Sequence, residues 1–143
     1  MSINMQIYLA LLGRLLLASL FLISGIGKVT GFAATVAYIQ SKGLPMAELG
    51  ATAAAALEIG AATALVLGWK TRWVAFLLTM YTLATAILFH HFWTFAPPQL
   101  AAQQVQFLKN ISIIGGLLSV MAWGPGDKSL DARKTINHLK EQA

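Results

Sequence analysis

The stretch IYLALLGRLLLASLFLISGI, residues 7–26, decides the fold, because Arg14 is the only charge in a long apolar run. The hydrocarbon core of a bilayer is about 30 Å thick, and a helix needs about 20 predominantly apolar residues to cross it. No basic residue precedes the stretch, and it exceeds the roughly 7–15 apolar residues of a secretory signal. We therefore predict a retained transmembrane helix at about residues 7–28.

The rest of the chain has the same apolar character. Of its 143 residues 57% are hydrophobic and 10% charged, whereas soluble domains average about 25% charged. Further apolar segments of membrane-spanning length occur at about residues 47–68, 72–91 and 105–123. Four crossings nearly fill the chain, so we predict one all-α transmembrane domain, residues 1–143, that ends in a polar tail at residues 124–143. An ordinary soluble fold is excluded.

The predicted crossings are joined by short connections. In residues 32–42 three apolar residues, Phe32, Val36 and Ile39, recur at helical spacing, and a glycine and a proline follow. We expect there a short interfacial helix between the first and second crossings of the four-helix bundle. The second and third crossings are separated by only a few residues around Lys70, which makes them antiparallel neighbours.

The cations decide the expected orientation. With four crossings, one side carries both termini and the connection near residue 70, and it holds Lys70, Arg72, Lys128, Arg133, Lys134 and Lys140. The other side holds Lys28, Lys42 and Lys109 at most. The positive-inside rule then predicts that both termini and the tail are cytoplasmic. The formal net charge of +5 reads as a topology signal, so nucleic acid is not an expected partner.

Three charges fall inside predicted crossings, namely Arg14, Glu58 and Lys109. Each costs about 2.5 to 3.5 kcal/mol at a helix centre, so each needs a partner. Counting about 1.5 Å per residue from the helix ends puts them within about one helical turn of the same depth. We expect a buried Arg14–Glu58–Lys109 network. It either only fixes helix packing, or it forms the polar floor of a pocket for a small polar group such as a quinone head.

Two adjacent histidines, His90 and His91, close the third crossing. One interpretation is an interfacial anchor in which both rings face lipid headgroups. Metal or haem ligation is disfavoured, because neighbouring helical residues point about 100° apart, and no metal site is predicted. In the third interpretation one histidine joins Lys109 and Asn110 at the outer mouth of the pocket and exchanges protons there.

Several motifs resemble the DoxX family of small bacterial inner-membrane proteins. They are Gly13-Arg14, the run from Phe21 to Lys28, Leu57-Glu58-Ile59-Gly60, His90-His91-Phe92-Trp93, the run from Phe107 to Gly116, and Gly124-Pro125-Gly126 with Ser129-Leu130-Asp131. The resemblance covers about residues 11–133. It implies a four-helix inner-membrane protein with Arg14, Lys28, Glu58, His90, His91, Lys109 and Asn110 at the polar motif positions.

The resemblance also suggests functions. Some relatives are described as the membrane subunit of thiosulfate:quinone oxidoreductase, and others as partners in oxidative-stress complexes. This chain has no cysteine, so it lacks thiol redox chemistry, and no residue is assigned a catalytic role. The first hypothesis is therefore a quinone-interacting, oxidoreductase-associated subunit that holds no cofactor of its own except a quinone. It would receive electrons from a separate soluble or membrane partner.

The alternatives are a non-enzymatic membrane anchor or assembly partner, and a small-molecule or proton permease. The permease needs several copies of the chain, because four helices make a small pore. Besides the lipid bilayer, a redox partner and further copies of the chain are thus the expected partners.

Overall fold

The computed structural model describes residues 2–142, without the side chains of residue 3 and of residues 136 and 138–141. Four of its helices are long and apolar enough to cross a membrane, which confirms the predicted all-α transmembrane bundle. They are α1 (Ile3–Thr30), α3 (Ala47–Leu67), α4 (Thr71–Phe89) and α5 (Gln99–Trp123). Shorter elements are α2 (Phe32–Ser41), the single 3-10 turn η1 (Phe92–Thr94) and α6 (Leu130–Glu141).

The start of α5 differs from the prediction. The helix begins at Gln99, directly after Pro98, and not at about Val105. Hydropathy did not mark this first part because it carries several glutamines, which are good helix formers all the same. The extra turns bring Gln103 level with the end of α4.

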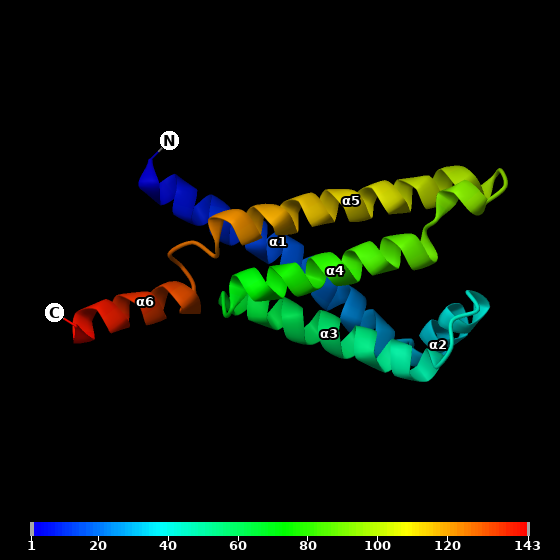
Figure 1. Cartoon of the computed structure of the whole chain (residues 1–143), viewed down its shortest axis with the longest axis horizontal. Coiled ribbons are helices and arrows are strands. Elements are labelled where there is room, and N and C mark those ends of the chain that lie inside the picture. The colour runs from blue at the N-terminus through cyan, green and yellow to red at the C-terminus, as the bar shows by residue number, and fades with distance from the viewer. Residues whose placement is uncertain (1, 143) are drawn as a thin grey trace.

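The long helices pack mainly in pairs, α1 on α3 and α4 on α5, with α3 beside α4 (Figure 1). At one end, which we call the tail end, lie both termini and the α3–α4 turn; at the other, the α2 end, lie α2 and the connection from α4 to α5 (Figure 1). The helices α1 and α5 diverge toward the α2 end (Figure 1). That both termini are cytoplasmic remains a prediction from the cation count.

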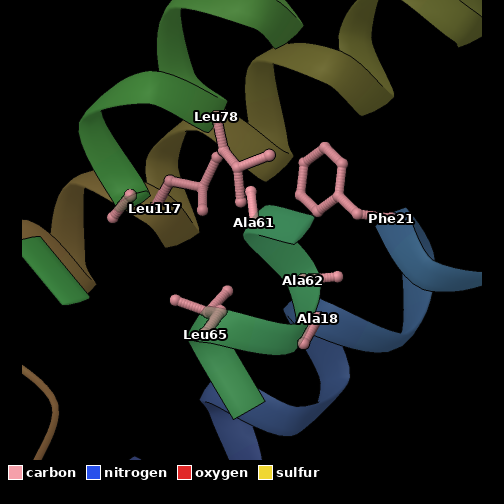
Figure 2. Close-up of a cluster of buried hydrophobic side chains, with 8 residues drawn as sticks. Ala18, Phe21, Ala61, Ala62, Leu65, Leu78 and Leu117 are labelled. Carbon is pink, nitrogen blue, oxygen red and sulfur yellow. The ribbon is translucent and has the colours of Figure 1, made fainter. Parts of the chain in front are cut away.

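The apolar core lies in the half of the bundle nearer the tail end. It combines small side chains of α1, α3 and α4 with a few large ones (Figure 2): Ala18, Phe21, Ala61, Ala62, Leu65, Ala75, Leu78 and Leu117. Small residues let helix backbones approach closely, which is how membrane helices gain packing energy. The alanine-rich α3 therefore sits against its neighbours with no internal gap at this level.

The two short helices lie at opposite ends of the bundle (Figure 1). Ile39 of α2 packs against Ala47 and Ala51 at the start of α3, which confirms a short helix between the first two crossings. At the tail end, Ser129 caps α6 by accepting a hydrogen bond from the backbone N–H of Ala132. The sequence suggested a solvated His138 in this tail, but that side chain lies outside the described part of the chain.

Candidate functional site

A buried polar triad lies between α1, α3 and α4. Glu58 of α3 is only 3% exposed, and its two carboxylate oxygens accept hydrogen bonds of 2.9 and 2.8 Å from the ammonium of Lys28 on α1. The hydroxyl of Tyr81 on α4 donates to the same carboxylate at 2.6 Å, and Lys28 also donates to Ser24 at 2.7 Å. In this triad of Lys28, Glu58 and Tyr81, the lysine and the tyrosine compensate the charge of a carboxylate that lies at membrane depth.

Close helix packing brings these groups together. A side chain at Gly25 would collide with Ile59 of α3, its Cβ lying only 2.8 Å from the Cγ1 atom, so the glycine allows α1 and α3 to touch beside Glu58. Ser24 and Lys28 are four residues apart and therefore share one face of α1. The short distance between the backbones is what lets the Lys28 ammonium reach Glu58.

The triad opens onto a cavity of about 770 Å³. Most of the cavity wall is apolar, with α1, α2, α3, α4 and α5 all contributing. Its polar lining includes Ser24, Lys28, Glu58, Tyr81, Thr82, Thr85, His90, Gln106, Lys109 and Asn110. A largely apolar pocket with a few convergent polar groups is the usual form of a small-molecule site.

The cavity opens sideways between α1 and α5. Toward the tail end these helices touch, since a Cβ at Gly116 would lie 3.2 Å from Leu17. Beyond this contact they diverge (Figure 1), and Leu20 and Ile23 of α1 line the cavity opposite Ile113 of α5. Leu20 and Ile23 are exposed and belong to a helix of membrane-spanning length, so the opening faces the lipid.

The two histidines have different surroundings. His90 lines the cavity, and its Nδ1 lies 2.9 Å from the side-chain oxygen of Gln103. That oxygen can only accept, so the Nδ1–H group of His90 donates this hydrogen bond. His91 does not line the cavity; its ring lies against Trp93 and Phe95.

Arg14 lies far from this cavity, and the expected Arg14–Glu58–Lys109 network does not form. The Arg14 side chain is 2% exposed and donates from Nη1 to the carbonyl of Pro125 at 2.5 Å. From Nη2 it donates to the carbonyls of Lys128 at 2.7 Å and Val66 at 3.4 Å. Among the described residues its Nε has no hydrogen-bond partner. The guanidinium therefore holds the segment after α5 against the end of α3.

Asp131 completes this attachment from the other side. Its carboxylate accepts hydrogen bonds of 2.8 Å from the backbone N–H groups of Lys70 and Thr71 and one of 2.9 Å from the Thr71 hydroxyl. Burial raises the pKa of Asp131, but these hydrogen bonds and the charge of Lys134 outweigh it, and the pKa lies below its ordinary value. We call the contacts of Arg14 and Asp131 the tail latch.

Comparisons with known proteins show the family of the chain. The sequence model of the DoxX family matches residues 9–91. Inner membrane protein YphA of Escherichia coli is 41% identical over 125 residues, which cover 87% of this chain and 89% of that protein. Inner membrane protein YqjF of the same organism is 37% identical over 121 residues, 85% and 88% of the two chains. The chain belongs to the DoxX family.

The DoxX chain is also similar to a second family. The SURF4 family model matches residues 53–137, the part that contains Glu58, Tyr81 and Asp131. ER-derived vesicles protein ERV29 of Saccharomyces cerevisiae is 31% identical over 70 residues, 49% of this chain and 23% of that protein. No solved structure matches the DoxX chain.

The wrong Arg14–Glu58 pairing in this DoxX protein has a simple cause. The depth count assumed that α1 and α3 end at the same level. In the structure Gly68, at the end of α3, lies beside Arg14, because a Cβ there would come within 2.8 Å of the Nη1 atom. The first turns of α1 therefore extend beyond α3. Glu58 lies level with Gly25, about 16 Å along α1 from Arg14 at 1.5 Å per residue.

Lys109 also stays apart from Glu58. It lines the cavity with Asn110, yet it forms no ion pair within the described residues. The DoxX triad uses Lys28 in its place. The resemblance had placed Lys28 at a polar motif position, but the depth count, which used only Arg14, Glu58 and Lys109, did not pair it with Glu58.

Two polar side chains of the DoxX chain, Tyr81 and Asp131, were not expected in the roles that the structure gives them. Tyr81 lies in the middle of a crossing, whereas tyrosines of membrane helices favour the interfaces, and that position was the available signal. Asp131 follows Ser129 at the start of a helical segment, where acidic residues are common, and nothing local indicated its partner 60 residues earlier.

Proposed function

We propose that this DoxX protein is a quinone-interacting membrane subunit that binds a quinone-type head in the cavity beside the Lys28–Glu58–Tyr81 triad. The single observation that carries the proposal is this polar triad at the base of a lipid-facing, mostly apolar cavity. Membrane quinones have a small polar head and a long apolar tail, which matches a polar base with a lateral opening. When bound, the quinone would supply reversible two-electron, two-proton chemistry.

The hydrogen bonds of the triad favour the reduced form of such a head. A carboxylate has about four acceptor positions, of which Lys28 and Tyr81 use three, leaving one on the Glu58 Oε2 atom. The three ammonium protons of Lys28 are already donated to Glu58 and Ser24. A quinol hydroxyl can therefore donate to Glu58 without breaking the triad, whereas a quinone carbonyl would need Lys28 to release a bond.

In the redox hypothesis a separate partner protein delivers two electrons to the quinone, which takes up two protons and becomes the quinol, while this chain binds and positions the head. Glu58 is the group placed to accept a hydrogen bond from the quinol hydroxyl, because it is the carboxylate of the triad and keeps a free acceptor position. Lys28 and Tyr81 hold the carboxylate in place.

A small chemical change at Tyr81 tests the proposal. We expect Tyr81→Phe to weaken binding of decylubiquinol to the detergent-purified protein by about tenfold, because the Glu58 carboxylate loses the hydrogen bond that holds it in position to accept from the quinol. Isothermal titration calorimetry with the reduced and oxidised probes measures this, and the reduced probe should bind more tightly. Tyr8→Phe is the matched control, because Tyr8 is 59% exposed and does not line the cavity. Equal affinities of the two variants would contradict the proposal.

The anchor hypothesis has one observation in its favour, the tail latch. The latch holds the start of α6 at a defined place beside the α3–α4 turn, which would suit a docking point for a soluble partner. Its test is a latch variant, Asp131→Asn, that abolishes assembly with a partner while decylubiquinol affinity is unchanged. The permease hypothesis is weakened by the apolar core, which lies between the cavity and the tail end and leaves no polar path in the described part of a single chain.

A further inference from the structure

Three polar side chains line the α5 edge of the cavity without any partner of their own. Gln106, Lys109 and Asn110 are three and four residues apart, so they share one face of α5. Within the described residues none of their side chains forms a hydrogen bond or an ion pair. All three carry N–H donors, and they lie on a helix of membrane-spanning length. Such groups are costly beside lipid tails unless an acceptor binds them.

The charges of the cavity show which kind of acceptor is missing. Its described lining contains two lysines, Lys28 and Lys109, and one carboxylate, Glu58. Lys28 and Glu58 form an ion pair of 2.8 Å and neutralise each other. Lys109 is left as an uncompensated cation, so the missing group is an anion.

The surroundings of Lys109 indicate where this anion comes from. Across the opening lie the exposed apolar side chains of Leu20 and Ile23, so a molecule seated here contacts lipid and protein together. Side chains of a helix tilt toward its N-terminus, which for α5 is the α2 end. Lys109 follows Gln99 by ten residues, about 15 Å along the axis, and its long side chain extends toward the headgroup layer.

We propose that an anionic phospholipid occupies the opening between α1 and α5. Its phosphate binds Gln106, Lys109 and Asn110, and an acyl chain enters the apolar part of the cavity. This site differs from the triad and is independent of the proposed quinone function. Because both ligands use the same apolar space, the lipid competes with a ligand at the triad. The occupancy of the cavity then depends on the lipid composition of the membrane.

Native mass spectrometry of the full chain in detergent tests the inference. With phosphatidylglycerol as probe, we expect one bound lipid and an affinity at least about tenfold higher than for phosphatidylcholine of the same acyl chains. Lys109→Gln should reduce the phosphatidylglycerol affinity about tenfold. Lys42→Gln is the matched control: it removes one cation at the same end of the bundle, where Lys42 lies over the ring of Tyr38 and outside the cavity lining.

Three outcomes would overturn the inference. Equal losses of phosphatidylglycerol affinity in Lys109→Gln and Lys42→Gln would mean a general charge effect. Equal affinities for the two lipids would mean that Lys109 does not recognise the anionic headgroup. Displacement of the lipid by inorganic phosphate at equal concentration would assign the cluster to a free anion. The decylubiquinol titration of Tyr81→Phe, carried out without added phospholipid, does not depend on lipid bound at Lys109, so it separates failure of this inference from failure of the proposed function.

Discussion

Two cations of the same helix behave in opposite ways. Arg14 and Lys28 both lie on α1, but Arg14 is enclosed by backbone carbonyls of the segments that it joins, while Lys28 binds a carboxylate at the wall of a cavity. Within the described residues no other ionised group is in hydrogen-bond contact with Arg14, and Arg14 does not line the cavity. The Lys28 site keeps a free acceptor and borders the cavity. The two cations therefore differ in access to the cavity, and only the Lys28 site is a candidate ligand site.

The largest effect is expected from a substitution at the enclosed Arg14 site. Arg14→Leu should lower the free energy of unfolding by about 3 kcal/mol, because buried carbonyls lose their donor, and should release the tail. Thermal melting in detergent and limited proteolysis after residue 124 measure the two effects. Arg72→Leu removes a cation from the same end, where Arg72 makes one 3.4 Å hydrogen bond to the Ala122 carbonyl, and should melt nearly like the parent. Similar melting of both variants would refute the latch.

An intermediate effect is expected from substitutions of Glu58, the partner of Lys28 at the cavity. Glu58→Leu leaves Lys28 without its carboxylate and should cost about 2 kcal/mol, less than the 3 to 5 kcal/mol of a fully buried pair, because the Lys28 side chain is 24% exposed and can be hydrated. Glu58→Gln keeps an acceptor for Lys28 and Tyr81 and should cost less than about 1 kcal/mol. The readout is again the melting temperature. Equal melting of the two variants and the parent would mean that the triad contributes nothing to stability.

The smallest effect is a pH dependence of the latch. The folded pKa of Asp131 is lowered, so its contribution to stability is present above the ordinary carboxyl value and is lost as the pH falls through the folded pKa. Asp131→Asn should therefore melt below the parent at about pH 6, and the difference should shrink as the pH falls below the ordinary carboxyl value of about 4. A difference that persists unchanged at low pH would mean that the charge of Asp131 does not stabilise the latch.

The sequence was informative where the physics is local. Membrane thickness and apolar runs such as residues 7–26 predicted the four crossings, and the intramembrane carboxylate Glu58 pointed to the polar centre of the molecule. The partners of Arg14 could not be found in this way, because they are backbone carbonyls that carry no side-chain signal and lie up to 114 residues away. The partner of Glu58 was misassigned because helix ends were assumed to be level.

The residues that line the cavity were also predicted only in part. A pocket bounded by Glu58, Lys109 and His90 was expected from depth alone, and these residues do line one cavity. Its expected floor of Arg14 was wrong, because Arg14 belongs to the latch. Of the two histidines only His90 lines this cavity, while the His91 ring packs against aromatic neighbours. The level of α1 relative to α3 made the difference for Arg14, and no hydropathy pattern contains it.

The latch also has a consequence for biosynthesis. The carbonyl of Pro125 follows Arg14 by 111 residues, and at a translation rate of roughly 5–20 residues per second it leaves the ribosome about 6 to 22 seconds later. For that time the nascent chain carries a guanidinium that lacks two of its three carbonyl acceptors, those of Pro125 and Lys128. We expect the first segment to wait at the edge of the bilayer, or beside the insertion machinery, until the last segment arrives. A chain interrupted before residue 125 would keep this unsatisfied charge and so be marked for removal.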